Sequence, residues 1–107
     1  MNDKIIIRKD FSDSPGAGYC EDGPFSGEEF YEKLLKPKFI KAKENGTKLE
    51  IDLDGVWGYP SSFVSGSFGK LSINYTPSEV LSVIIFISEE SETRKNRIIS
   101  EIKNPTR

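Results

Sequence analysis

Residues 48–71, KLEIDLDGVWGYPSSFVSGSFGKL, decide the fold, because two different periodicities meet inside them. Apolar residues alternate with acidic residues over 48–54, which is typical of a β-strand with one buried face. From Phe63 onwards apolar residues recur at helical spacing. Pro60 suits the first position of that helix, because a proline has no N–H to lose there. The stretch predicts a strand, a turn at residues 55–58 and a helix.

The residues before this stretch predict an earlier helix with clear ends. Ser26 and Glu29 are spaced as a capping box, which begins a helix. Gly46 supplies the left-handed position at which a helix commonly ends. Pro37 lies between them, and we expect it to kink or interrupt the helix because it cannot donate a backbone hydrogen bond.

The remaining segments complete an alternation of strands and helices. The β-branched run Ile5–Ile7 predicts a buried strand, and the many Gly and Pro residues of 11–24 predict a long loop. The pattern of residues 71–75 is ambiguous and is compatible with a short extended piece. Residues 82–88 are apolar on both faces, which predicts a central strand. Ser88 is expected to cap the last helix.

This order of elements predicts one α/β domain over residues 1–107, with a small mixed sheet of about four strands and helices packed on it. Composition excludes several classes of protein. The chain has no His and one Cys, so Ser-His and Cys-His nucleophile pairs and an internal disulfide are absent, and a cytoplasmic setting is expected. The net charge of −2 disfavours nucleic-acid binding. The apolar run Val83–Ile87 is too short to span a membrane, and we expect no cofactor.

Three motifs suggest chemistry at first sight. Asp52 and Asp54 lie at the end of a strand, where two carboxylates could hold Mg²⁺ or simply face solvent. The glycine-rich loop at Gly16 and Gly18 lacks the spacing of a dinucleotide-binding fingerprint. Cys20 is followed by two acidic residues, which raise the pKa of a thiol and disfavour a nucleophile.

The segment around the second helix start is more informative. Ser61 and Ser62 fall in the first turn of a predicted helix, which accommodates an anion or a phosphate on Ser itself, although a hydroxyl there also commonly caps the helix. Trp57 and Tyr59 precede them in a turn that we expect to be exposed, and Phe63 follows. Exposed aromatic residues are frequent anchors of protein–protein interfaces, so these three are interface candidates.

The block over 48–71, with the earlier blocks GPFSGEEF at 23–30 and LLKP at 34–37, resembles the STAS-like domain family of uncharacterised bacterial proteins. That family is similar to the STAS domains of anti-sigma factor antagonists, in which a Ser at a helix start is phosphorylated. On this resemblance Ser61 and Ser62 match the two serines and Asp52 matches the strand aspartate. Pro60 stands where the antagonists have Asp. The resemblance implies a protein partner, such as an ATP-binding protein of the histidine-kinase type.

We therefore expect a non-enzymatic regulatory module that docks onto another protein through the turn and helix at residues 57–68. One alternative is a phospho-switch with Ser61 as acceptor. Another is a small ligand- or nucleotide-binding domain that uses the glycine-rich loop with Asp52 and Asp54. A homodimer is compatible with each of these functions.

Overall fold

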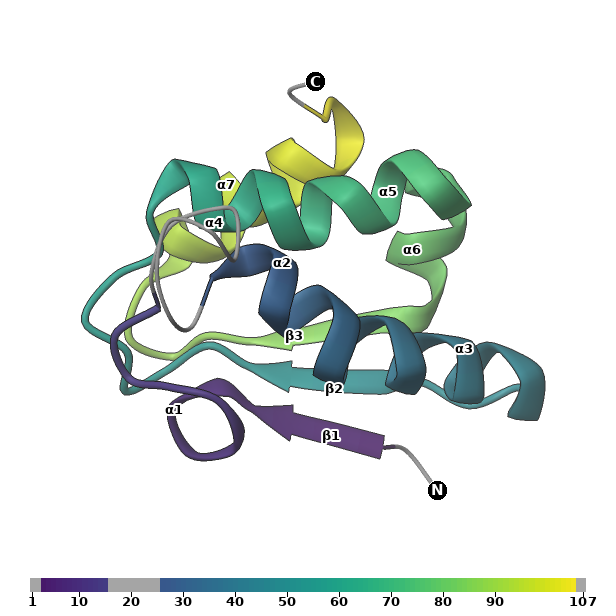
Figure 1. The fold of residues 1–107 in the computed structure, drawn as a ribbon, viewed down its shortest axis with the longest axis horizontal. Helices are drawn as coiled ribbons and strands as arrows, with labels where there is room; N and C mark the ends of the chain where they lie inside the picture. Colours follow the sequence, from purple (N-terminus) through teal and green to yellow (C-terminus); the bar gives the residue numbers. More distant parts are fainter. Residues whose placement is uncertain (1–2, 16–25, 106–107) are drawn as a thin grey trace.

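The computed structural model of the protein describes residues 3–15 and 26–105. Its strands β1 (Asp3–Ile6), β2 (Leu49–Asp52) and β3 (Ile84–Ile87) form one sheet in the order β1-β2-β3. Both pairings are parallel. The expectation of a mixed sheet of about four strands was therefore wrong in detail, since the described residues form three strands that all run in one direction (Figure 1).

The first long helix runs without a break through α2 (Gly27–Phe30), the π-helical turn η2 (Tyr31–Leu35) and α3 (Lys36–Asn45). The predicted cap is confirmed, because Ser26 Oγ accepts the backbone N–H of Glu29 at 3.1 Å. Gly46 ends the helix in the left-handed conformation, with φ of 68°. Pro37 does not interrupt the helix. The wider π turn directly before α3 gives the chain room to pass a residue that has no N–H to donate.

The second long helix combines α4 (Ser61–Val64), the π-helical turn η3 (Ser65–Gly69) and α5 (Lys70–Tyr75). Residues 71–75, whose sequence pattern is ambiguous, are thus helical. Leu71 and Ser72 are buried on the same face as Phe68, and Ser72 Oγ donates to the backbone oxygen of Ile102. Continuing the helix buries that face, which a change to extended backbone would expose.

The last part of the chain contains α6 (Pro77–Val83), strand β3 and α7 (Glu92–Lys103). Strand β3 lies at the edge of the sheet rather than at its centre, and Ile85 is 43% exposed. Helix α7 begins after Ser91, whose Oγ accepts the N–H of Arg94 at 3.1 Å. Ser88, the expected cap, instead donates to the backbone oxygen of Ser91 in the preceding turn.

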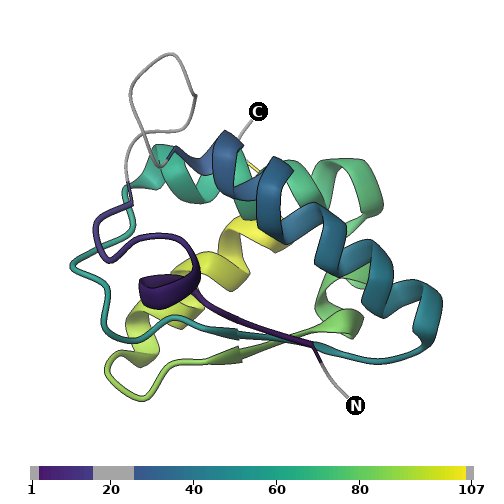
Figure 2. The same cartoon turned by 60° about the horizontal axis from the view of Figure 1, so that its bottom comes forward.

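The long helices lie over one face of the sheet, and the one-turn helix α1 (Ile7–Asp10) follows directly after the edge strand β1 (Figures 1 and 2). Ile5, Leu49 and Ile51 point into the core between sheet and helices and are fully buried. Above them the rings of Phe30, Phe63 and other aromatic residues pack at centroid distances of 5.2–6.0 Å. This core fixes the position of the segment that climbs from β2 to α4.

Candidate functional site

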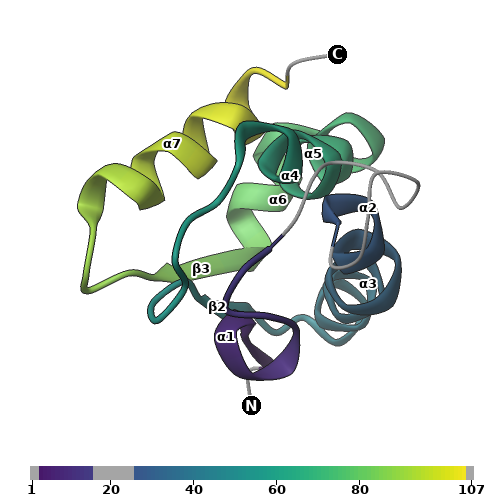
Figure 3. The ribbon, with the colours of Figure 1, turned by 60° about the vertical axis from the view of Figure 1, so that its left-hand side comes forward.

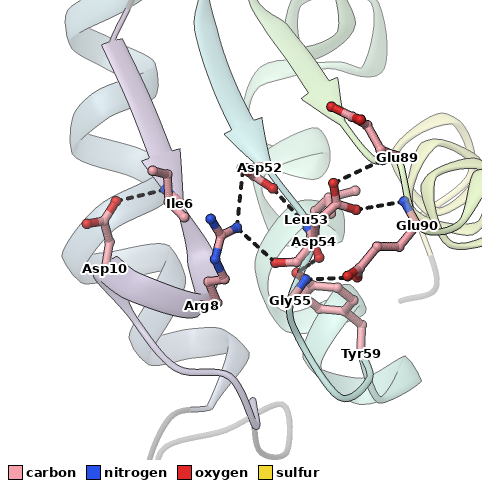
Figure 4. A network of polar contacts seen from close by, with 10 residues as sticks. All are labelled: Ile6, Arg8, Asp10, Asp52, Leu53, Asp54, Gly55, Tyr59, Glu89 and Glu90. Atoms are coloured by element: carbon pink, nitrogen blue, oxygen red, sulfur yellow. Dashed lines mark hydrogen bonds and ion pairs between the residues drawn. The ribbon is translucent and has the colours of Figure 1, made fainter.

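The carboxyl ends of the three parallel strands are joined by a network of polar contacts (Figure 4). Arg8, which follows β1, places its Nη1 3.3 Å from Asp52 Oδ2 and 3.3 Å from the backbone oxygen of Asp54. The Asp54 carboxylate accepts hydrogen bonds from the backbone N–H groups of Glu89 and Glu90, each at 3.0 Å. The network therefore ties the segment after β3 to the segment after β2.

The predicted carboxylate pair, Asp52 and Asp54, is engaged within this network. The Oδ1 atom of Asp52 accepts the backbone N–H of Asp54 at 2.9 Å, and Glu90 accepts the N–H of Gly55 at 2.8 Å. A hollow of about 450 Å³ lies here and is lined by Arg8, Asp52, Asp54, Gly55, Glu89 and Glu90. In the part of the chain that the structure describes, no group of three or more His, Cys, Asp or Glu side chains is placed to hold a metal ion. The contacts of Asp52 and Asp54 thus connect the ends of neighbouring strands in the sheet.

Two of the three interface candidates lie inside the fold. Tyr59 is only 6% exposed, and its hydroxyl donates to the backbone oxygen of Leu53 at 3.0 Å. Burial raises the pKa of this phenol well above its usual value. Phe63 is fully buried against Phe30. The expectation that Tyr59 and Phe63 offer contact area to a partner was wrong, because both rings fill the core and the Tyr59 hydroxyl finds its acceptor there.

Trp57 is the aromatic residue that the turn presents to solvent, with 85% of its surface exposed. Its backbone is nevertheless held in place. The Trp57 N–H donates to the backbone oxygen of Asp13 at 2.9 Å, and Arg94 Nη1 donates to the oxygen of Val56 at 3.1 Å. The guanidinium of Arg94 also lies 5.2 Å from the centre of the Tyr59 ring. The backbone of the turn is therefore held in place, and the indole projects from it into solvent.

Ser61 and Ser62 are exposed at the start of α4, as the sequence predicts. Neither hydroxyl caps the helix, since Pro60 is the capping residue and no side chain makes a cap hydrogen bond there. Instead Arg97 Nη2 lies 3.4 Å from Ser61 Oγ. Figure 3 shows why these residues meet: the segment between β2 and α4 passes beside α7.

Arg97 lines two neighbouring hollows. The larger, of about 590 Å³, lies between the second long helix and α7 and is lined by Ser61, Val64, Thr93, Asn96, Arg97, Ser100, Glu101 and Asn104. The other, of about 490 Å³, lies beside the exposed indole and is lined by Ser14, Pro15, Trp57, Gly58, Tyr59, Pro60 and Arg97. Together they make one surface around Trp57, Ser61 and Arg97, here called the docking surface.

Sequence reasoning missed Arg94 and Arg97, because on a charged helix they look like ordinary solvated residues. Their spacing of three places them on one face of α7. No local pattern reveals that this face meets a turn 36 to 38 residues earlier in the chain. The glycine-rich loop with Gly16 and Gly18, and Cys20, lie outside the described residues.

Comparison with protein families places the chain in a known family. The model of a family described as a STAS-like domain of unknown function covers residues 26–94, which include both long helices, all of β2 and β3, and the turn that carries Trp57. Searches of curated proteins and of solved structures found no match. Among the helices of the described residues, none combines the length and the apolar character that a bilayer-spanning segment requires.

Proposed function

The chain belongs to the family of STAS-like domains of unknown function, and from that premise we propose that it is a non-enzymatic module that binds another protein through residues 57–68. The observation that carries the proposal is that Trp57 is 85% exposed although its backbone N–H is held by a hydrogen bond to Asp13. Covering an exposed indole of this kind contributes strongly to the free energy of binding, because Trp is among the residues most enriched at interface hot spots.

Rigidity supports this interpretation. A backbone segment that must be ordered on binding loses conformational freedom, which costs about 1–2 kcal/mol for each residue that is fixed. The contacts of Arg94 with Val56 and Tyr59 fix the turn in the free protein, so little of that cost remains for the backbone around Trp57. The exposed start of α4 beside it adds polar groups that a partner can reach.

Capture from a lysate of the encoding organism tests the proposal, with the full chain immobilised as wild type, as Trp57→Ala and as Ile85→Ala. Ile85 is the matched control, because it is also an exposed large apolar residue but lies on strand β3. We expect a protein that the wild type and Ile85→Ala retain and that Trp57→Ala loses about tenfold or more. An ATP-binding protein of the histidine-kinase type is the first candidate, and it is then purified and titrated.

The proposal fails when no captured protein depends on Trp57 while circular dichroism shows that Trp57→Ala is folded. Dependence on Ile85 instead would place the interface on the sheet edge. Both outcomes can be read from the same set of samples.

A phospho-switch at Ser61 is a second candidate, favoured by the contact of its hydroxyl with Arg97. A kinase would transfer the γ-phosphoryl group of ATP to Ser61 Oγ, releasing ADP and the hydroxyl proton. The phosphate adds a charge of about −1.5 to −2 and can pair with a neighbouring guanidinium. Phosphopeptide mapping of protein isolated from its host tests this, with Ser61→Ala and Ser62→Ala as controls. Phosphate found at neither serine, or at Ser62 alone, excludes the switch at Ser61.

A further inference from the structure

Arg97 differs from its neighbour Arg94 in how the fold uses it. Arg94 is half-buried, and its guanidinium is occupied by the oxygen of Val56 and the ring of Tyr59. Arg97 is exposed, and the hydrogen bond that it makes within the described residues, to Ser61 Oγ, is long at 3.4 Å. Among the described residues, no carboxylate lies within ion-pair distance of Arg97. Within the part of the chain that the structure describes, most of its donors therefore have no acceptor.

The position of this guanidinium is as informative as its charge. Arg97 lines the same hollow as Trp57, and that hollow also contains Pro15 and Pro60 as apolar walls. A single short segment of a partner can therefore touch the indole and the guanidinium together. When such a segment covers Arg97 and removes its water, the guanidinium needs new acceptors, and the two oxygens of a carboxylate match the planar fork of an arginine well.

We infer that the docking surface recognises a peptide segment of its partner in which an Asp or Glu side chain lies next to an aromatic or aliphatic side chain. The apolar side chain packs on Trp57, and the carboxylate pairs with Arg97. The inference rests on the proposed function and specifies the chemistry of its partner. A nucleic acid offers anions as well, but the net charge of −2 and Glu101 in the adjoining hollow oppose a polyanion.

Selection from a library of random short peptides displayed on phage tests this without knowledge of the natural partner. The full chain serves as bait as wild type, Trp57→Ala, Arg97→Glu and Lys103→Glu. Lys103→Glu is the matched control, because it makes the same change of charge at an exposed position six residues further along α7, outside both hollows. We expect the wild type and Lys103→Glu to enrich peptides with Asp or Glu beside an aromatic or aliphatic residue.

Binding of the best peptide is then measured by calorimetry. We expect Arg97→Glu to weaken it by about tenfold or more, and added salt to weaken it further. A peptide with Lys in place of its acidic residue should bind Arg97→Glu better than it binds the wild type, a reversal that a merely structural role of Arg97 would not produce.

The two proposals fail in different ways. Peptides that need Trp57 but show no acidic preference and bind Arg97→Glu normally overturn the inference and leave the proposed function standing. A selection that enriches no Trp57-dependent peptide also overturns the inference, while the capture experiment with Trp57→Ala and Ile85→Ala decides the proposed function by itself.

Discussion

Arg94 and Arg97 lie about one turn apart on α7, yet their environments predict effects of different size on stability. Replacing Arg94 by Ala removes the hydrogen bond to Val56 and the packing on the Tyr59 ring, so we expect the free energy of unfolding to fall by about 1–3 kcal/mol. Arg97→Ala is the matched control and should change it by less than about 0.5 kcal/mol. Urea denaturation measures both. Equal losses for the two variants would show that Arg94 and Arg97 contribute alike to stability.

Tyr59 makes stability depend on pH at the alkaline end. Burial raises the pKa of its hydroxyl in the folded protein, whereas in the unfolded chain a Tyr ionises near pH 10, its usual pKa of about 10. Below that pH the Tyr59 hydroxyl is protonated in both the folded and the unfolded state, and its contribution to the free energy of unfolding is fully present. Above it the unfolded state releases the proton while the folded state keeps it, so the free energy of unfolding falls as the pH rises.

We therefore expect the wild type to lose more stability between about pH 9 and about pH 11 than Tyr59→Phe does, although Tyr59→Phe starts lower because it leaves the oxygen of Leu53 without its donor. Urea denaturation at the two pH values measures the loss of stability of each protein. Contributions from the other ionisable groups are the same in both proteins and cancel when the two losses are subtracted. Parallel pH dependence in the two proteins would show that Tyr59 ionises as freely in the fold as in the unfolded chain.

At the scale of elements, the two long helices approach each other so closely that glycine is required at the start of the first. A Cβ added to Gly27 would lie 2.3 Å from the backbone oxygen of Phe63, and backbone cannot rotate away as a flexible side chain can. We expect Gly27→Ala to lower the free energy of unfolding by about 1–3 kcal/mol. Gly58→Ala is the control, since nothing lies within 4 Å of the added atom.

Thermal and urea denaturation of the two variants decide this prediction. Gly58 lies in the turn beside Trp57. Its variant therefore also shows whether a substitution next to the docking surface leaves the stability of the fold unchanged. A Gly27→Ala protein as stable as the wild type would mean that α2 and α4 can separate without cost.

Elements with strong local signals could be predicted from the sequence. The cap at Ser26, the stop at Gly46 and the strand around Ile51 are set by residues only a few positions apart, and the structure confirms all three. Residues 71–75 and the edge position of β3 could not be predicted, because both depend on which distant surface covers them. Local residues cannot report that Ser72 meets Ile102.

At the scale of the whole molecule, the docking surface is assembled from segments far apart in the chain. The sequence predicts its first half, the exposed Trp57 and the exposed Ser61, because a turn and a helix start can be read locally. Its second half, Arg97, comes from a helix that begins about thirty residues later and is positioned by packing. Half of the candidate site was therefore open to prediction and half was not.

The network at the strand ends links these halves of the docking surface. The carboxylate of Asp54 holds the N–H groups of Glu89 and Glu90, and this turn leads directly into α7, which carries Arg97. In Asp54→Asn an NH2 group, which cannot accept a hydrogen bond, replaces one carboxylate oxygen. The hydrogen bond to the remaining oxygen is no longer strengthened by a negative charge. We expect the free energy of unfolding to fall by about 1–3 kcal/mol and the amides of residues 89 and 90 to exchange hydrogen faster.

Glu44→Gln is the control, because it removes the same charge from an exposed position near the end of α3. Hydrogen exchange measured residue by residue shows whether the amides of residues 89 and 90 exchange faster in Asp54→Asn than in Glu44→Gln. Titration with a Trp57-dependent peptide then shows whether Asp54→Asn also weakens binding at the docking surface. Because Asp54 touches neither hollow beside Arg97, weaker peptide binding in Asp54→Asn would come through the placement of α7. Unchanged exchange at residues 89 and 90 would show that the turn before α7 is held by other contacts, and the network at the strand ends would then have no part in placing Arg97.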